Sequence, residues 1–232
     1  MKRFLPLILL FYVGISHGQI SVDNSFTTQA QVATLIEDVL IGGSSTCASI
    51  SNVTKRTGLN GDPDHEGMLT APVNGIGSFS ANGTNFPFSE GIILMSGDAA
   101  MAPGPNTTVT LSGGGVDQVP WDGDDDLNGI IGLSGVDPDD TYNATYVTFD
   151  FTPNINFIEF NFIFASEEYD GGTECGFNDS FAFILTDLVT GAVTNLAIVP
   201  GTTDPISTFT IRDLPDPPPC PDVNPSFFDK YN

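Results

Sequence analysis

The segment from Phe157 to Leu185 constrains the fold most, because two alternating apolar runs flank an acidic connection. In Phe157–Phe164 and Phe177–Leu185, aromatic and branched apolar residues recur at every second position, which is typical of β-strands. The connection between them has no basic residue and four acids, namely Glu167, Glu168, Asp170 and Glu174. So much negative charge needs water or a cation to solvate it. The sequence therefore predicts two core strands that present an acidic loop.

The charge balance of the whole chain is strongly acidic. Its 232 residues include 29 Asp and Glu against 6 Lys and Arg, which gives a net charge of −23 and a pI near 4.1. Each contact with a phosphate needs a basic side chain, so nucleic acid and anionic membranes are excluded as natural partners. The acidity suits either cation binding or adaptation to salty water, and the composition leaves both open.

Residues 1–18 have the layout of a secretory signal peptide. Lys2 and Arg3 precede an apolar stretch, Phe4–Val13, which is too short to span a membrane and is followed by Gly14–Gly18. We expect cleavage before Gln19, a single domain over residues 19–232, and no membrane span in the mature chain. The protein is then secreted or displayed on the cell surface.

One helix and many short strands are expected in the mature chain. Thr27 or Thr28 can cap a helix that Gly42–Gly43 ends, with an apolar stripe of Val32, Leu35, Ile36, Val39 and Leu40. Between turn residues, the strands expected are Ala48–Lys55, Gly75–Phe79, Gly91–Ser96, Tyr146–Phe151, Ile155–Ala165, Ser180–Asp187, Asn195–Val199 and Ile206–Ile211. This pattern favours a mostly β fold, an antiparallel sandwich or jelly roll. Ala99–Asp140 is interpreted as a long surface excursion.

The motifs FIFASEEYDGG and GFNDSFAFIL resemble the signature of the choice-of-anchor L domain. Further blocks agree in order, including FTTQAQVATLIEDVLIGG, DDDLNGIIG and NLAIVPGTTDPIS, and the resemblance runs from about Phe26 to the last residue. It implies a module of secreted and surface proteins of Bacteroidetes and related bacteria. It also implies that further strands follow residue 232, so we expect the sequence to be truncated at its C-terminus.

Two acidic constellations are candidates for binding calcium. In the segment WDGDDDL, Asp122, Asp124 and Asp126 alternate with other residues in a Gly-containing loop, an arrangement that can surround a hard cation with oxygen ligands. The alternative is a solvated Asp-rich turn. The second constellation comprises Glu167, Glu168, Asp170, Asn178 and Asp179. Since adjacent residues at a strand end face opposite ways, at most one of Glu167 and Glu168 can join a given site. We name Glu167 and Asp179 as ligands, with a structural Asn-Asp turn as the alternative.

Three cysteines in an exported chain allow one disulfide. Cys175 lies in the acidic loop and Cys220 in the Pro-rich segment DLPDPPPCPDVNP, and both stretches read as loops, where a covalent link is most useful. We predict that they pair. Cys47 is then left over, or its partner lies beyond residue 232.

The function predicted from these features is a secreted, non-enzymatic cell-surface or adhesion module with acidic, calcium-binding loops. One alternative is a carbohydrate-binding module that uses Trp121, Tyr142 or Tyr169 as a stacking platform. Another is a glycoside hydrolase built on Glu167 and Asp179. After the predicted signal peptide, no nucleophile elbow of the G-x-S-x-G type, HExxH motif or P-loop occurs in the sequence, and we predict no catalytic residue. The expected partner is a carbohydrate or another surface protein.

Overall fold

The computed structural model describes residues 20–43, 48–59, 72–104, 121–132, 141–156 and 159–230. The predicted signal peptide, Cys47, Phe157 and much of the Ala99–Asp140 segment lie outside these residues. The elements are β1 Ser21–Asp23, α1 Gln29–Leu35, the π-helical turn η1 Ile36–Leu40, β2 Ala48–Arg56, β3 Ile76–Ser80, β4 Glu90–Leu94, the 3-10 turn η2 Ala99–Met101, α2 Asp125–Gly132, β5 Tyr146–Pro153, the 3-10 turn η3 Thr173–Cys175, β6 Ser180–Phe181, β7 Ile184–Thr186, β8 Val193–Asn195, β9 Ile206–Ser207 and the 3-10 turn η4 Pro225–Phe227.

Helix α1 begins with a capping box. The Thr28 hydroxyl accepts a hydrogen bond from the Gln31 backbone N–H (3.3 Å), and the Gln31 side chain accepts one from the Thr28 N–H (3.0 Å). These bonds satisfy donors that a helix N-terminus leaves free. The helix then widens into η1, where the Ile41 N–H donates to the Ile36 carbonyl. Gly42 and Gly43 follow with positive φ, which ends the helix as predicted.

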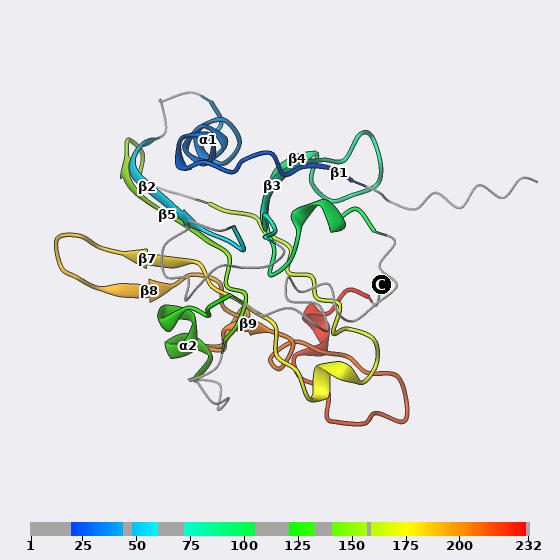
Figure 1. Ribbon diagram of the computed structural model, residues 1–232. Coiled ribbons are helices and arrows are strands. Elements are labelled where there is room, and N and C mark those ends of the chain that lie inside the picture. The colour runs from blue at the N-terminus through cyan, green and yellow to red at the C-terminus, as the bar shows by residue number, and fades with distance from the viewer. Residues whose placement is uncertain are drawn as a thin grey trace, which may run out of the picture.

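The first hydrophobic core lies under α1. Val32, Leu35, Ile36 and Ile76 are buried there. The side chains packed around them come from β2, β4 and β5 and from the residues just before and after α1, namely Ile50, Val53, Ile92, Val147, Phe149, Phe26, Val39 and Ile41. Strands β1, β3 and β4 form one antiparallel sheet and β2 pairs antiparallel with β5; Figure 1 shows α1 at the top of this half of the molecule. Leu40, predicted to be in the apolar stripe, is instead exposed, because the wider π-helical turn moves it off the buried face.

A second, smaller core belongs to the later part of the chain. Ala197, Val199 and Ile206 are buried there, and Phe164, Phe181, Phe183 and Ile211 pack against them. Two short antiparallel pairs, β6 with β9 and β7 with β8, border this core. The β7–β8 hairpin projects from the body of the molecule (Figure 1).

The predicted fold class is confirmed: the structure is mostly β with antiparallel pairing, and a helix lies near the N-terminus. The first four predicted strands correspond to β2, β3, β4 and β5. The predicted strand Ile155–Ala165 is wrong over its described residues, which form no strand. The predicted strand Ser180–Asp187 is interrupted between β6 and β7, because the Phe183 N–H donates to the Asn195 side-chain oxygen (3.1 Å) instead of a backbone carbonyl.

Helix α2 was not predicted. It forms inside the segment that the sequence indicates to be a surface excursion. The Asp124 carboxylate accepts a hydrogen bond from the Leu127 N–H (2.9 Å), and the Asp124 carbonyl accepts the first helical bond, from the Asn128 N–H (2.8 Å). Asp124 is therefore the N-cap of α2.

The approach of two chain segments at Gly123 gives a stability test. A β-carbon at this position would collide with the backbone carbonyl and hydroxyl of Thr141. We expect Gly123→Ala to lower the free energy of unfolding by about 1–3 kcal/mol, as overpacking does elsewhere. The control is Gly129→Ala in α2, where a β-carbon meets nothing within 4 Å and helix propensity favours Ala. Urea denaturation measures both, and equal midpoints for the two variants would contradict the close contact.

Candidate functional site

The acidic loop of residues 166–179 is held between two aromatic segments. The Phe160 ring packs against Phe183 with centroids 4.6 Å apart, and the Phe162 ring packs against Phe181 at 5.2 Å. The residue number rises from 160 to 162 in one segment while that of its partner falls from 183 to 181, so the two segments run antiparallel. The loop therefore emerges from two adjacent segments, as predicted, although 159–165 contributes side chains without a strand ladder.

Ser166 organises the entry into the loop. This buried residue donates a hydrogen bond from its hydroxyl to Asp179 Oδ2 (2.5 Å), and the same hydroxyl accepts one from the Glu168 N–H (3.0 Å). One side chain thereby connects the start of the loop to its end. Glu168 and Asp179 are brought to the same region as a result.

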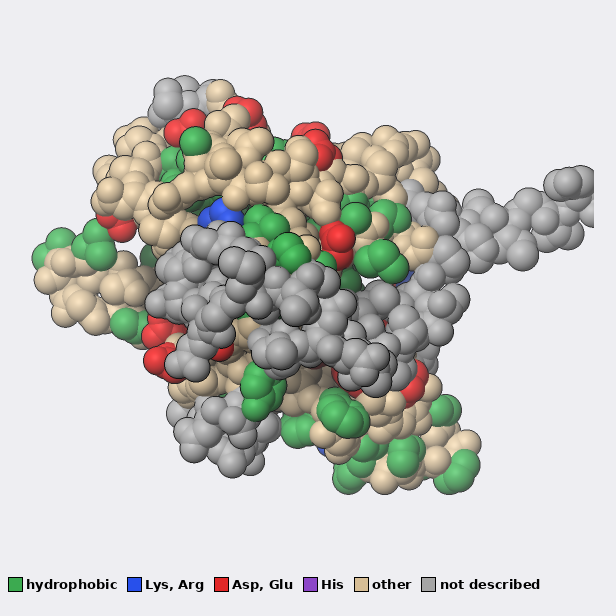
Figure 2. All heavy atoms as spheres, in the orientation of Figure 1, with side chains coloured by type: hydrophobic (Ala, Val, Ile, Leu, Met, Phe, Trp, Pro, Cys, Tyr) green, Lys and Arg blue, Asp and Glu red, His purple; other side chains and the backbone are tan. Residues whose placement is uncertain are grey.

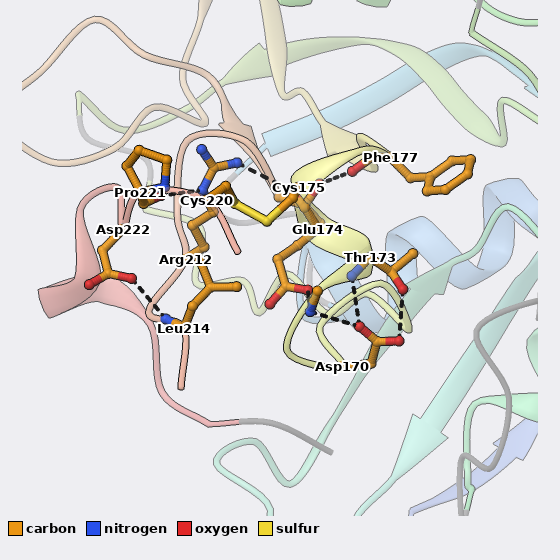
Figure 3. Close-up of a disulfide and its surroundings, with 12 residues drawn as sticks. Asp170, Thr173, Glu174, Cys175, Phe177, Arg212, Leu214, Cys220, Pro221 and Asp222 are labelled. Atoms are coloured by element: carbon orange, nitrogen blue, oxygen red, sulfur yellow. Dashed lines mark hydrogen bonds between the residues drawn. A yellow bond between two sulfur atoms is a disulfide. The ribbon is translucent and has the colours of Figure 1, made fainter. Parts of the chain in front are cut away.

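Asp170 has a structural role in the middle of the loop. Its carboxylate accepts hydrogen bonds from the N–H groups of Gly172 (3.0 Å) and Thr173 (2.8 Å) and from the Thr173 hydroxyl (2.7 Å), as Figure 3 shows in part. The bonds from Thr173 lower the pKa of Asp170. Gly171, directly after Asp170, lies in this turn at φ +92°, a conformation that favours glycine. Asp170 therefore stabilises the turn, and the donors of Gly172 and Thr173 solvate its negative charge.

The far side of the loop is fixed by a disulfide and an arginine. Cys175 and Cys220, the pair that the sequence favours, are joined in the structure with an S–S distance of 1.97 Å (Figure 3). Arg212 donates to the Glu174 carbonyl (3.2 Å) and to the Pro221 carbonyl (2.8 Å), so it holds both sides of the disulfide. Glu174 itself is fully buried, and its carboxylate accepts a hydrogen bond from the Gly172 N–H (2.7 Å). The loop is consequently closed by covalent and polar links.

Glu168 and Asp179 are the two acids whose charge is not solvated in this way. Burial, with the charges of Asp179, Glu167, Asp170 and Glu174 as further causes, raises the pKa of Glu168 to about 7. Burial also raises the pKa of Asp179, against the lowering effect of the bond from Ser166. Glu168 Oε2 is a buried atom without a hydrogen-bond partner among the described residues. Within the described part of the chain, this oxygen therefore lacks a donor of the kind that solvates Asp170.

Two further buried polar atoms lie beside Asp179 in the chain. The side-chain nitrogen of Asn178 and the hydroxyl of Ser180 have no hydrogen-bond partner within the described part of the chain. The other end of the Asn178 amide accepts only long bonds, from the Thr208 hydroxyl and the Phe209 N–H (both 3.4 Å). Buried polar atoms without partners are uncommon in native structures and call for an explanation. Those of Glu168, Asn178 and Ser180 occur at the two ends of one loop.

The other predicted constellation is built around the N-terminus of α2. Asp124 caps the helix, Asp125 and Asp126 lie exposed in its first turn, and Asp122 forms an isolated bridge with Tyr142. Acidic residues in a first turn interact favourably with the helix dipole. The guanidinium of buried Arg56 donates to the carbonyls of Asp122 and Gly123, which ties this segment to β2. Helix capping thus accounts for much of the Asp-rich pattern without a cation.

The structure limits the aromatic residues that could stack on a sugar. Trp121 is only 2% exposed, and its indole N–H donates to the Ala144 carbonyl (3.0 Å). Tyr169 is partly buried; its ring contacts Phe164 and Phe228, and its hydroxyl donates to the Ile211 carbonyl (2.8 Å). Trp121 as a stacking platform is therefore wrong, because it is a core residue. Tyr142 is exposed.

Sequence reasoning considered both Glu167 and Glu168 and chose Glu167, and it did not consider Ser166. The alternation of a strand does not predict which of Glu167 and Glu168 lies near Asp179. That depends on the turn at Ser166, whose hydroxyl bonds both Asp179 and the Glu168 N–H. A serine immediately before the two acids was the available signal, since serine hydroxyls bind backbone N–H groups two residues along.

The disulfide gives a prediction about stability. Replacing both Cys175 and Cys220 by Ser releases a link across 45 residues of sequence, and the chain-entropy estimate for such a loop is a loss of about 4 kcal/mol in unfolding free energy. Urea denaturation of the double variant against the oxidised protein measures it. Reduction of the parent protein is the control and should reproduce the same loss; an unchanged midpoint in both would show that the link does not constrain the unfolded chain.

The raised pKa of Glu168 gives a pH prediction. A carboxyl with a raised pKa retains in the folded state a proton that the unfolded chain releases, so folding is favoured at low pH. In metal-free buffer, the contribution of Glu168 to stability should be present below its ordinary pKa of 4.5 and be lost as pH rises through about 7. Glu168→Gln should flatten this decline in a series of melting curves.

Glu90→Gln is the matched control for that series, since it removes one exposed carboxylate from β4. It should leave the decline between these pH values in place. A Glu168→Gln profile that runs parallel to the parent profile would contradict the assignment.

Within the described residues, no group of three or more His, Cys, Asp or Glu side chains gathers as a metal site, and no described helix is long and apolar enough to cross a membrane. No curated protein matches the chain, and no solved structure matches it. The model of one family, the choice-of-anchor L domain, matches residues 21–232, nearly the whole chain. The chain therefore belongs to the choice-of-anchor L domain family.

Proposed function

We propose that this protein is an exported, non-enzymatic surface module whose acidic loop 166–179 binds calcium. The observation that carries the proposal is the pair Glu168 and Asp179, which are held together by Ser166 and partly withdrawn from water. The family membership supports a surface-associated, non-catalytic role. Calcium binding and adhesion go beyond that membership.

The electrostatics of the pair favour a cation over a proton as the neutralising group at neutral pH. Every charge that acts on the pKa of Glu168 is an acid, and a buried carboxylate without a partner is costly. A bound divalent ion would supply the positive charge that the segment lacks. The proposal thus explains why two acids are kept close together in this loop.

The donor set suits calcium better than a transition metal. Carboxylate oxygens at Glu168 and Asp179 are hard ligands, and the neighbouring Asn178 and Ser180 carry side-chain oxygens as well. Calcium accepts six to eight oxygens in irregular geometry, including backbone carbonyls and water, whereas magnesium demands a nearly ideal octahedron. An irregular loop with few carboxylates is therefore a plausible calcium site even though it holds no cluster of three acids.

The same two residues do not fit a hydrolase as well. A glycosidase needs one protonated and one ionised carboxyl group, with environments that separate their pKa values. Here burial raises the pKa of both Glu168 and Asp179. This common direction supports a shared ligand in preference to separate acid and nucleophile roles.

Calcium should stabilise the folded protein. An ion that binds only the folded state adds about 2.7 kcal/mol at a hundredfold excess over its dissociation constant. We therefore expect calcium to raise the melting temperature more than magnesium does at the same concentration, because magnesium dehydrates reluctantly and tolerates irregular sites poorly. The double variant Glu168→Gln with Asp179→Asn should lose this difference.

The matched control is Asp124→Asn with Asp126→Asn, which removes the same number of charges at the N-terminus of α2. It should retain the calcium effect. If it loses the effect while the first pair retains it, the ion binds at α2 instead. If sodium chloride at equal ionic strength stabilises as much as calcium, the effect is general screening and the proposal is wrong.

A further inference from the structure

We propose that the β7–β8 hairpin is a self-association surface that pairs with the same hairpin of a second copy of this chain. The hairpin extends away from the rest of the molecule (Figure 1), and hydrophobic side chains gather at its end (Figure 2). This inference is independent of the calcium site.

The turn of the hairpin holds apolar side chains in an exposed position. Val189 is 95% exposed and Leu188 75% exposed. The turn that presents them is well bonded: the Asp187 carboxylate accepts hydrogen bonds from the N–H groups of Val189 (2.8 Å) and Thr190 (3.1 Å), and the Gly191 N–H donates to the Asp187 carbonyl (2.7 Å). Turns usually place polar residues at such positions. Val193, on β8, is 65% exposed and extends the apolar surface.

Within the described residues, no further strand pairs with the outer edges of the hairpin. The Asp187 N–H donates to Ala192 and the Leu196 N–H donates to Phe183. Inward-directed and outward-directed pairs alternate along an antiparallel ladder, so the pair Thr186–Val193 directs its N–H and C=O groups outward. Among the described strands, β7 and β8 pair only with each other. An open edge is a template for another strand unless charges, Pro or bulges block it, and the range 184–195 contains no Lys, Arg, Glu or Pro.

The charge distribution of the chain indicates which partner the β7–β8 hairpin would pair with. The chain carries a net charge of −23, yet Asp187 is the only charged residue from Ser180 to Thr203. A basic partner would gain more by contacting the acidic surface elsewhere. A charge-poor hairpin instead suits a partner as acidic as this protein, and a second copy is that partner.

The hairpin is long enough for two copies to pair although both carry a large negative charge. The three steps from Ile184 to Asp187 span about 10 Å when extended, and the turn at residues 188–190 lengthens the hairpin further, whereas electrostatic interactions are screened over about 8 Å at physiological ionic strength. Two hairpins lying antiparallel, edge to edge, would keep the acidic bodies roughly a hairpin length apart. Their mutual repulsion is then largely screened.

Sedimentation of the whole secreted chain at rising sodium chloride concentration tests the proposal. We expect a monomer–dimer equilibrium that shifts toward dimer as salt screens the bodies. The charge-neutral variant Leu188→Ser with Val189→Ser should weaken dimerisation by about tenfold or more, because it removes the two most exposed apolar side chains of the hairpin, whose burial in the dimer would favour association. Met101→Ser, at a residue 54% exposed on η2, is the control and should dimerise like the parent.

A second variant separates edge pairing from contact by the turn alone. Val193→Pro removes an outward N–H and leaves the inner bonds of the hairpin in place, a position where Pro is tolerated at a sheet edge. We expect a monomer with an unchanged circular dichroism spectrum. A parent chain that stays monomeric at all salt concentrations, dimers that tolerate both hairpin variants, or dimers that dissociate as salt rises would each overturn the proposal.

Discussion

The shortage of positive charge is the constraint on which the rest of this structure depends. Two of the six basic residues, Lys2 and Arg3, lie in the predicted signal peptide, which leaves Lys55, Arg56, Arg212 and Lys230 for the mature chain. Arg56 is buried, and both arginines donate to backbone carbonyls of acidic segments. They therefore fix the paths of the two acidic loops and leave the carboxylates of those loops to be solvated by other means.

Backbone N–H groups do much of that solvation. Asp98, Asp124, Asp170 and Asp187 each accept a hydrogen bond from an N–H two or three residues along the chain. At Asp170 and Asp187 these bonds lower the pKa of the carboxyl group, and at all four residues they define turns or helix starts. In this acidic chain, several carboxylates thus stabilise the local structure by accepting hydrogen bonds from nearby backbone N–H groups. Glu168 and Asp179 stand out because burial raises the pKa of both and Glu168 Oε2 has no donor among the described residues.

The sequence predicted those parts of the fold that depend on local pattern. Thr28 with Gln31 and the glycines at 42 and 43 define α1, and alternation defines β2 to β5. Helix α2 escaped prediction because its eight residues include two glycines, and its formation depends on the Asp124 cap and on packing. The phenylalanines of 159–165 were expected to mark a strand, but ring packing on Phe181 and Phe183 needs no backbone ladder. At the acidic loop, the residue types were predictable, while the choice of Glu168 over Glu167 depends on the turn at Ser166.

The disulfide has a mechanical consequence for a module displayed on a surface. Tension on the chain outside the Cys175–Cys220 loop passes directly through the sulfur–sulfur bond and bypasses the residues between them. Those residues include β6 to β9 and the projecting hairpin. Stretching then extends the segments on either side while this part bears no load, so the covalent link shields the projecting β7–β8 hairpin from the pulling force.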